Sequence, residues 1–172
     1  SFVKNFSDQW LNLSDIDFTT PDSKLYPEFD LILQEAMLGE THAFLQEMIR
    51  EDLSVTNVVD SDFTMLNERI AHHYGIKGVR GTEFRKVELQ PKHRRGGIIT
   101  HASVLKVTAN GTTTSPVVRG VWMLKRIMGE KTLPPPDDVP SIEPDIRGAE
   151  SIREQLDKHR NTQACAVCHV KI

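Results

Sequence analysis

A helical spacing of apolar residues is the feature that most constrains the fold of this chain. From Pro27 the sequence reads PEFDLILQEAMLGETHAFLQEMIRED, in which apolar residues recur about one helical turn apart. The expected inward positions are Phe29, Ile32, Leu33, Ala36, Met37, Phe44, Leu45, Met48 and Ile49. Pro27 suits the first turn of a helix, and Gly39 is a position where the helix can bend. The run predicts a long amphipathic helix packed against a core.

The same spacing predicts helices on both sides of this run. The opening segment places Phe2, Val3, Phe6, Trp10 and Leu11 on one helix face. The segment RRGGIITHASVLKV is ambiguous between strand and helix, but its apolar spacing favours a helix. A final helix is expected over AESIREQLDKHR.

Two further segments carry start and stop signals. DSDFTMLNERIAHHYG predicts a helix that begins at Asp60 or Asp62 and ends at Gly75 in a left-handed conformation. TTTSPVVRGVWMLKRIMGEK predicts a helix with Ser115 as N-cap, Pro116 at its first position, and Gly129 after its end. The expected inward residues of these two helices are Phe63, Leu66, Ile70, Val118, Val121, Trp122, Leu124 and Ile127.

The helical pattern is interrupted between residues 76 and 89. GIKGVRGTEFRKVEL contains three glycines followed by a weak alternation, which predicts a short hairpin or irregular crossing and a boundary between subdomains. LPPPDDVPSIEPD predicts an extended, proline-rich strap. The expected fold class is mainly α, with two interlocked helical subdomains at residues 1–75 and 81–172, a short irregular or β crossing, and the strap.

Composition excludes some classes of function. A net charge of -3 over 172 residues argues against general affinity for nucleic acid, and no apolar run reaches the length needed for a membrane span. The first residues lack the pattern of a signal peptide. Residue 1 falls inside an amphipathic segment, and Ile172 follows the last motif almost at once, so we expect a piece of a longer protein.

The stretch NTQACAVCHVKI contains the only two cysteines of the chain, Cys165 and Cys168, followed at once by His169. This is the CxxCH pattern of c-type haem attachment, in which both thiols bond the porphyrin and the histidine ligates the iron. Three other interpretations stay open. A zinc site would need a fourth ligand, a redox dithiol would need a βαβ context that the sequence does not show, and the pattern can arise by chance.

The motif assigns only one face of the haem iron. A methionine, a second histidine or an open position would each give a different chemistry on the distal face. His159, His73 and His101 are the distal candidates, whereas the methionines lie mostly on helical apolar stripes and are expected in the core. The basic stretch FRKVELQPKHRR, which includes Arg95, would suit haem propionates or an acidic redox partner; a solvated face is the simpler interpretation.

Several long motifs also carry a resemblance to a known family. LNERIAHHYGI, RGGIITHASVLKVTANGTTTSPVVRGVWMLKRIMG, LPPPDDVPSIEPDIRGA, IREQLDKHR and CAVCHVKI occur in the order found in planctomycete-type cytochrome c proteins of unknown function. Residues 1 to 75 resemble the first of two adjacent domains, domain of unknown function fifteen-ninety-two, and residues 81 to 172 resemble the second, fifteen-eighty-eight. The resemblance implies haem c on Cys165 and Cys168, His169 as proximal ligand, export to the periplasm or beyond, and a redox role.

These expectations give one leading function and two alternatives. The leading function is electron transfer by covalent haem c within a larger secreted redox protein, with a redox partner or other domains of the parent protein as partners. The first alternative is a haem enzyme with an open distal site, such as a peroxidase, so enzymatic activity is left undecided. The second is a non-catalytic interaction module in which CxxCH binds zinc or forms a disulfide.

Overall fold

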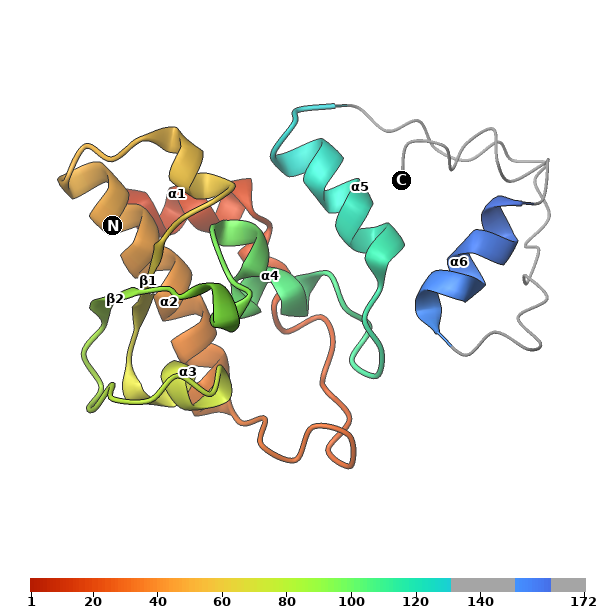
Figure 1. Cartoon of the computed structure of the whole chain (residues 1–172), viewed down its shortest axis with the longest axis horizontal. Helices are drawn as coiled ribbons and strands as arrows, with labels where there is room; N and C mark the ends of the chain where they lie inside the picture. Colours follow the sequence, from red (N-terminus) through yellow and green to blue (C-terminus); the bar gives the residue numbers. More distant parts are fainter. Residues whose placement is uncertain (131–150, 162–172) are drawn as a thin grey trace.

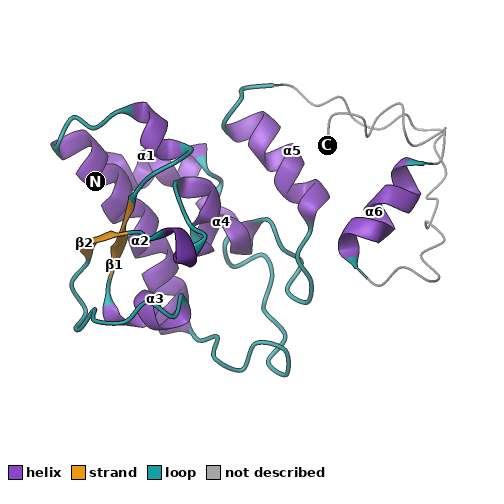
Figure 2. Cartoon of the chain, viewed as in Figure 1, coloured by secondary structure: helices purple, strands orange, loops and turns teal. Residues whose placement is uncertain are grey.

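A computed structural model of the chain describes residues 1–130 and 151–161. α-Helices dominate these residues, and the only sheet among them has two strands (Figures 1 and 2). Short 3₁₀ turns lie at Leu13–Asp15, Val55–Val58, Pro91–His93 and Ile98–Thr100. The predicted proline-rich strap lies outside the described residues. The mainly α prediction is therefore confirmed for the part of the chain that the structure describes.

The longest described helix, α2 (Leu31–Arg50), is the one that the apolar spacing predicts. It begins after Asp30 rather than near Pro27, because Asp30 is extended and its Oδ1 accepts the N–H of Leu33 at 2.6 Å. Most of the predicted inward residues are buried, but Ile32 is 69% exposed and Ile49 is 59% exposed. The predicted apolar face was therefore too wide at both ends of the helix.

Helices α1 (Phe2–Trp10) and α5 (Pro116–Arg126) are joined by two indole groups. Trp10 Nε1 donates to the carbonyl of Arg126 at 2.6 Å, and Trp122 Nε1 donates to the carbonyl of Leu11 at 2.9 Å. The predicted cap of α5 is confirmed, since Ser115 Oγ accepts the N–H of Val118. These two hydrogen bonds hold α1, at the N-terminus, directly against α5.

The helix predicted from Asp60 or Asp62 is wrong in its first half. Strand β1 (Phe63–Leu66) pairs antiparallel with β2 (Arg85–Glu88), and α3 (Glu68–His73) starts only after Asn67, whose side chain accepts the N–H of Ile70. All four residues of β1 are buried, and so short an apolar run fits a strand as well as a helix. Gly75 has the predicted left-handed conformation, with φ +69°.

The second half adds α4 (Ala102–Val107), which confirms helix over part of RRGGIITHASVLKV, and α6 (Ile152–Arg160), which confirms the last predicted helix. The crossing predicted over residues 76–89 supplies β2, which pairs with β1 instead of forming a local hairpin.

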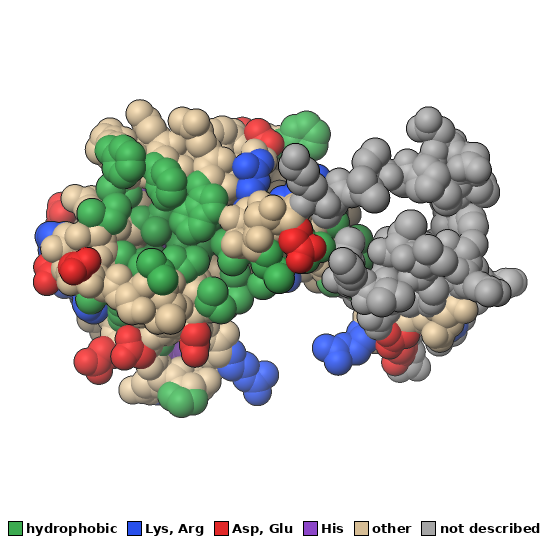
Figure 3. Space-filling model, turned by 90° about the horizontal axis from the view of Figure 1, so that it is seen from above, with side chains coloured by type: hydrophobic (Ala, Val, Ile, Leu, Met, Phe, Trp, Pro, Cys, Tyr) green, Lys and Arg blue, Asp and Glu red, His purple; other side chains and the backbone are tan. Residues whose placement is uncertain are grey.

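The core consists of two clusters that share α2. One cluster includes Phe44 and Met48 of α2 with Phe63 and Trp122, and the other includes Met37 of α2 with residues of β1, α3 and α4. Figure 3 shows hydrophobic side chains also gathered on the surface. No helix in residues 1–130 or 151–161 has the length and hydropathy of a membrane span.

Candidate functional site

The predicted haem motif lies outside the described residues. Attachment through the side chains of Cys165, Cys168 and His169 therefore stays a prediction. His159 belongs to α6, but its side chain also lies outside the described part. Residues 1–130 and 151–161 contain no group of three or more His, Cys, Asp or Glu side chains arranged to hold a metal ion.

The side chain of His101 is buried in the protein core. It is 2% exposed, and its Nδ1 is 2.9 Å from Thr41 Oγ1, which in turn is 2.7 Å from Ser103 Oγ. Its Nε2 is buried and has no hydrogen-bond partner among the described residues. Burial, aided by the charge of Arg95, lowers the pKa of His101 to about 3, so the ring is neutral.

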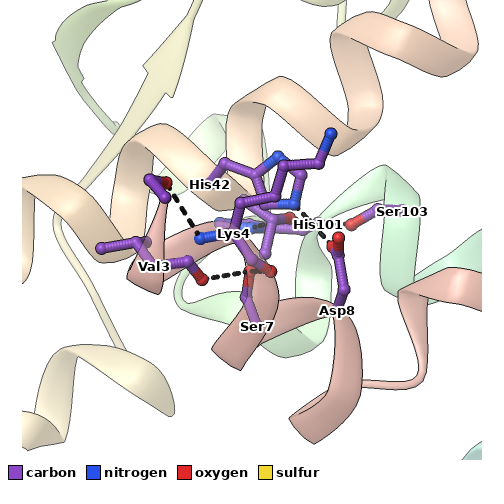
Figure 4. A network of polar contacts seen from close by, with 9 residues as sticks. Val3, Lys4, Ser7, Asp8, His42, His101 and Ser103 are labelled. Atoms are coloured by element: carbon purple, nitrogen blue, oxygen red, sulfur yellow. Dashed lines mark hydrogen bonds and ion pairs between the residues drawn. The ribbon is translucent and has the colours of Figure 1, made fainter.

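Aromatic packing fixes the His101 ring further. The ring of Phe44 meets it edge-on, with 5.0 Å between the ring centroids. Figure 4 shows His101 and Ser103, together with the hydrogen bond of 2.7 Å between His42 Nε2 and Asp8 Oδ1. His101 therefore occupies a core position.

His73 has a different environment. It lies at the end of α3, is half-buried, and lines a cavity of about 370 Å³. Burial lowers the pKa of His73, and the charge of Arg95 lowers it further, so its imidazole is neutral at neutral pH. A neutral imidazole that faces a cavity is able to bind a metal or accept a proton.

The cavity lies among α2, α3, α4 and the segments before α2 and α5. Its apolar lining comes mainly from Phe29, Leu33, Met37, Ala102 and Leu105. Its ionisable lining comes from His73, Arg95, Lys106, Arg119 and Glu28. An apolar body with cations beside it suits an organic anion better than a neutral or a cationic ligand.

Arg95 lines this cavity and also contacts residues behind it. Its guanidinium carbon lies 3.4 Å from the centroid of the Tyr74 ring, and its Nη1 donates to the carbonyl of Thr100 at 2.7 Å. The other members of the predicted basic stretch do not line the cavity. Lys86, for example, lies over the ring of Phe63 and 3.8 Å from a carboxylate oxygen of Glu47. Of the basic stretch, only Arg95 therefore takes part in this site.

Behind Arg95 lies a buried acid that the sequence did not lead us to expect. Glu40 is 1% exposed, and its Oε1 accepts from Thr64 Oγ1 at 2.8 Å, while its Oε2 accepts from the phenol of Tyr74. The backbone N–H of Ala102 donates to that phenol at 2.8 Å. Burial raises the pKa of Glu40 to about 7, although the hydrogen bonds and Arg95 oppose this effect.

A signal for Glu40 was present in the sequence. It follows Met37 by three positions and precedes Phe44 by four, so it falls on the apolar stripe of α2. A carboxylate at such a position needs buried partners, and Tyr74 and Thr64 supply them.

Comparison with known proteins gives two family matches. Residues 1–76 match PSD4, a protein of unknown function (DUF1592), and residues 95–172 match PSCyt3, a protein of unknown function (DUF1588). No curated protein and no solved structure gave a significant match. His73 thus lies in the first matched region, and Arg95 begins the second. The chain therefore carries the domains of unknown function DUF1592 and DUF1588 in tandem, in the order of the planctomycete-type proteins that its sequence resembles.

Proposed function

We propose that this protein binds haem c covalently and transfers electrons as part of a larger secreted redox protein. The observation that carries the proposal is the CxxCH pattern of Cys165, Cys168 and His169, which lies inside the region matched by PSCyt3. The short name of that family refers to a cytochrome, although its description is of unknown function. Both thiols would form thioethers, and His169 would be the proximal ligand. Haem iron supplies one-electron redox chemistry when it is bound.

Of the two distal candidates whose side chains the structure describes, His73 fits better than His101. Its imidazole is neutral and faces a cavity with an apolar lining, whereas His101 would have to leave a packed site to reach any ligand. A second histidine on the iron favours a low potential and a closed, six-coordinate carrier. The cavity can also surround part of a porphyrin, since its lining residues include Phe29, Met37 and Leu105.

One observation favours a second candidate function. Arg95 and His73 line the same cavity, and a neutral imidazole with a guanidinium can accept a proton from peroxide and stabilise the charge that develops on it. In that case His73 would stay off the iron and act as a base. The two functions differ in the coordination of the iron, because a carrier is six-coordinate and low-spin, whereas a peroxidase keeps an open position.

Export of the protein is part of the proposal. Bacterial c-type cytochromes are matured outside the cytoplasm, so a haem c protein of this kind would be periplasmic or secreted. Its partners would be a redox protein or other domains of its parent chain.

The test is production of the chain in a host that matures c-type cytochromes. We expect a c-type pyridine haemochrome that stays with the denatured polypeptide, and loss of this band in a Cys165→Ser, Cys168→Ser double variant. A low-spin spectrum of the native protein supports the carrier, and a high-spin spectrum that changes with peroxide supports the enzyme. A colourless chain that contains one zinc would contradict both and favour the interaction module.

A further inference from the structure

We propose that the cavity lined by His73 and Arg95 binds a carboxylate attached to an apolar body, with Arg95 as its main anchor. The inference rests on described residues alone and does not require haem. The carboxylate has two sources, a propionate of a bound haem or a free organic acid, and both offer the same chemistry to the site. The experiments below separate them.

The size and lining of the cavity define the apolar body. A volume of about 370 Å³ lies within the range of pockets that hold small organic molecules, roughly 300–1,000 Å³. Phe29, Leu33, Met37 and Leu105 line it, and they come from two separate parts of the chain, α2 with the residues just before it and α4. Transfer of a short alkyl chain or a ring edge from water onto these side chains is favourable.

The charges around the cavity define the head group. Arg95, Lys106 and Arg119 all line it, and none of them has a carboxylate within 4.0 Å in residues 1–130 and 151–161. The ion pairs of these residues use other cations, for example Arg69 with Asp30 and Arg80 with Glu68. Glu28 is the only acidic side chain of the lining within the described residues. The cavity therefore has an excess of positive charge.

Arg95 is the cation with the most hydrogen-bonding capacity left. Lys106 Nζ donates to two backbone carbonyls, those of Ile16 and Thr19, and Arg119 donates from two of its nitrogens to Thr108 and Thr114. Arg95 donates from one nitrogen only, to Thr100. A guanidinium has five N–H groups, so Arg95 can still bind a carboxylate with two parallel hydrogen bonds.

Arg95 is also held in place before any ligand binds. Its guanidinium stacks on the Tyr74 ring at 3.4 Å, and the phenol of Tyr74 is fixed by Glu40 and by the N–H of Ala102. A positioned guanidinium loses less side-chain entropy on binding than a free one. Glu40 and Tyr74 are thus positioning residues for the anchor.

The first experiment uses the full chain prepared without haem. Octanoate is titrated by calorimetry, and octanamide, which has the same alkyl chain and no charge, serves as the matched ligand. We expect octanoate to bind at least about tenfold more tightly and to shift the NMR signal of the Met37 methyl group. Equal affinities of the two ligands, or no binding of either at millimolar concentration, would overturn the proposal for this form.

Variants then test the anchor and the place of binding. Arg95→Gln should weaken octanoate binding by about tenfold and leave octanamide unchanged, because it removes the charged hydrogen bonds only. Lys92→Gln is the control, since Lys92 is an exposed cation of the same basic stretch and does not line the cavity. Leu105→Trp should fill the cavity and abolish binding of both ligands. An Arg95→Gln chain that binds octanoate as the unaltered chain does would contradict the assignment.

The haem-loaded chain separates the two sources. If octanoate binds to it and Arg95→Gln weakens that binding, the ligand is a free acid. If octanoate is excluded and Arg95→Gln shifts the midpoint potential of the haem more than Lys92→Gln does, the ligand is a propionate. If octanoate is excluded and the potential of Arg95→Gln is unchanged, the proposal fails. A chain that never attaches haem refutes the proposed function, whereas the titration without haem still decides this inference.

Discussion

The phenol of Tyr74 donates a hydrogen bond to Oε2 of Glu40, and this contact ties the end of α3 to the middle of α2. Glu40 is almost completely buried, and Tyr74 is the residue on which Arg95 stacks. The acid, the phenol and the guanidinium therefore form one connected unit behind the cavity.

Replacing Glu40 with Gln should change how stability depends on pH. Burial raises the pKa of Glu40 from its ordinary value of 4.5 to about 7, so between these pH values the folded state holds a proton that the unfolded state has lost. The contribution of Glu40 is fully present below pH 4.5 and is lost as the pH rises through about 7. The loss is on the order of 3 kcal/mol.

The measurement is urea denaturation at pH 5 and pH 7. The unaltered chain should lose more stability between these pH values than Glu40→Gln, by on the order of 2–3 kcal/mol. Glu47→Gln is the matched control, because Glu47 lies on the same helix and is paired with Arg50. An equal pH dependence in Glu40→Gln and in the unaltered chain would show that Glu40 is ionised or neutral in both states alike.

Removal of the Tyr74 hydroxyl should destabilise the fold. Tyr74→Phe keeps the ring on which Arg95 stacks but leaves Glu40 Oε2 and the N–H of Ala102 without this partner. We expect a loss of about 1–3 kcal/mol in the free energy of unfolding. Tyr26→Phe is the control and should cost about 0.5 kcal/mol or less, because Tyr26 is 38% exposed and water can replace its bond to Thr112.

In haem-loaded protein, replacement of His73 should alter the iron. If His73 is the sixth ligand, His73→Ala converts a low-spin spectrum to a high-spin one and raises the midpoint potential. His72→Ala should change neither, because His72 is the exposed neighbour and does not line the cavity. An unchanged low-spin spectrum in His73→Ala would assign the distal face to another residue, such as His159.

Two glycines with the same backbone conformation should respond differently to alanine. Gly75 and Gly97 have φ values of +69° and +68°, so alanine is strained at both by about 1–2 kcal/mol. A Cβ on Gly97 would lie 2.6 Å from the carbonyl oxygen of Val58, whereas nothing lies within 4 Å of a Cβ on Gly75. Gly97→Ala should therefore lower the melting temperature clearly more than Gly75→Ala, and equal effects would mean that the backbone at Val58 moves aside.

Local signals predicted the best-defined helices. The spacing of Leu33, Met37 and Phe44 predicts α2, and the adjacent Ser115 and Pro116 predict the start of α5. Both signals are local, because helix caps and amphipathic faces depend on residues that are close together in the sequence. Strand β1 could not be predicted in this way. Its four buried residues fit either period, and its partner β2 begins 19 positions after its last residue, Leu66. Tertiary pairing decided the structure there.

The candidate site also depends on contacts that local sequence signals do not predict. The sequence identifies His73 and His101 alike, as histidines in partly apolar segments. In the structure His73 lines a cavity, whereas His101 is buried against the ring of Phe44. That difference depends on contacts between distant segments. The buried position of Glu40 could have been predicted, because a carboxylate on an apolar helix stripe is a local signal. Its partners Tyr74 and Thr64 could not, because they are distant in the chain.

The exchange of indole hydrogen bonds between α1 and α5 has a consequence for any attempt to divide this protein. Trp10 and Leu11 belong to the segment matched by PSD4, Trp122 and Arg126 belong to the segment matched by PSCyt3, and β2 lies between the two segments while pairing with the first. A chain cut at residue 76 would leave β1 with an unpaired edge and α1 without its indole partner. The two matched segments therefore contribute to one folded unit, and a chain without either segment would lose contacts that hold the other in place.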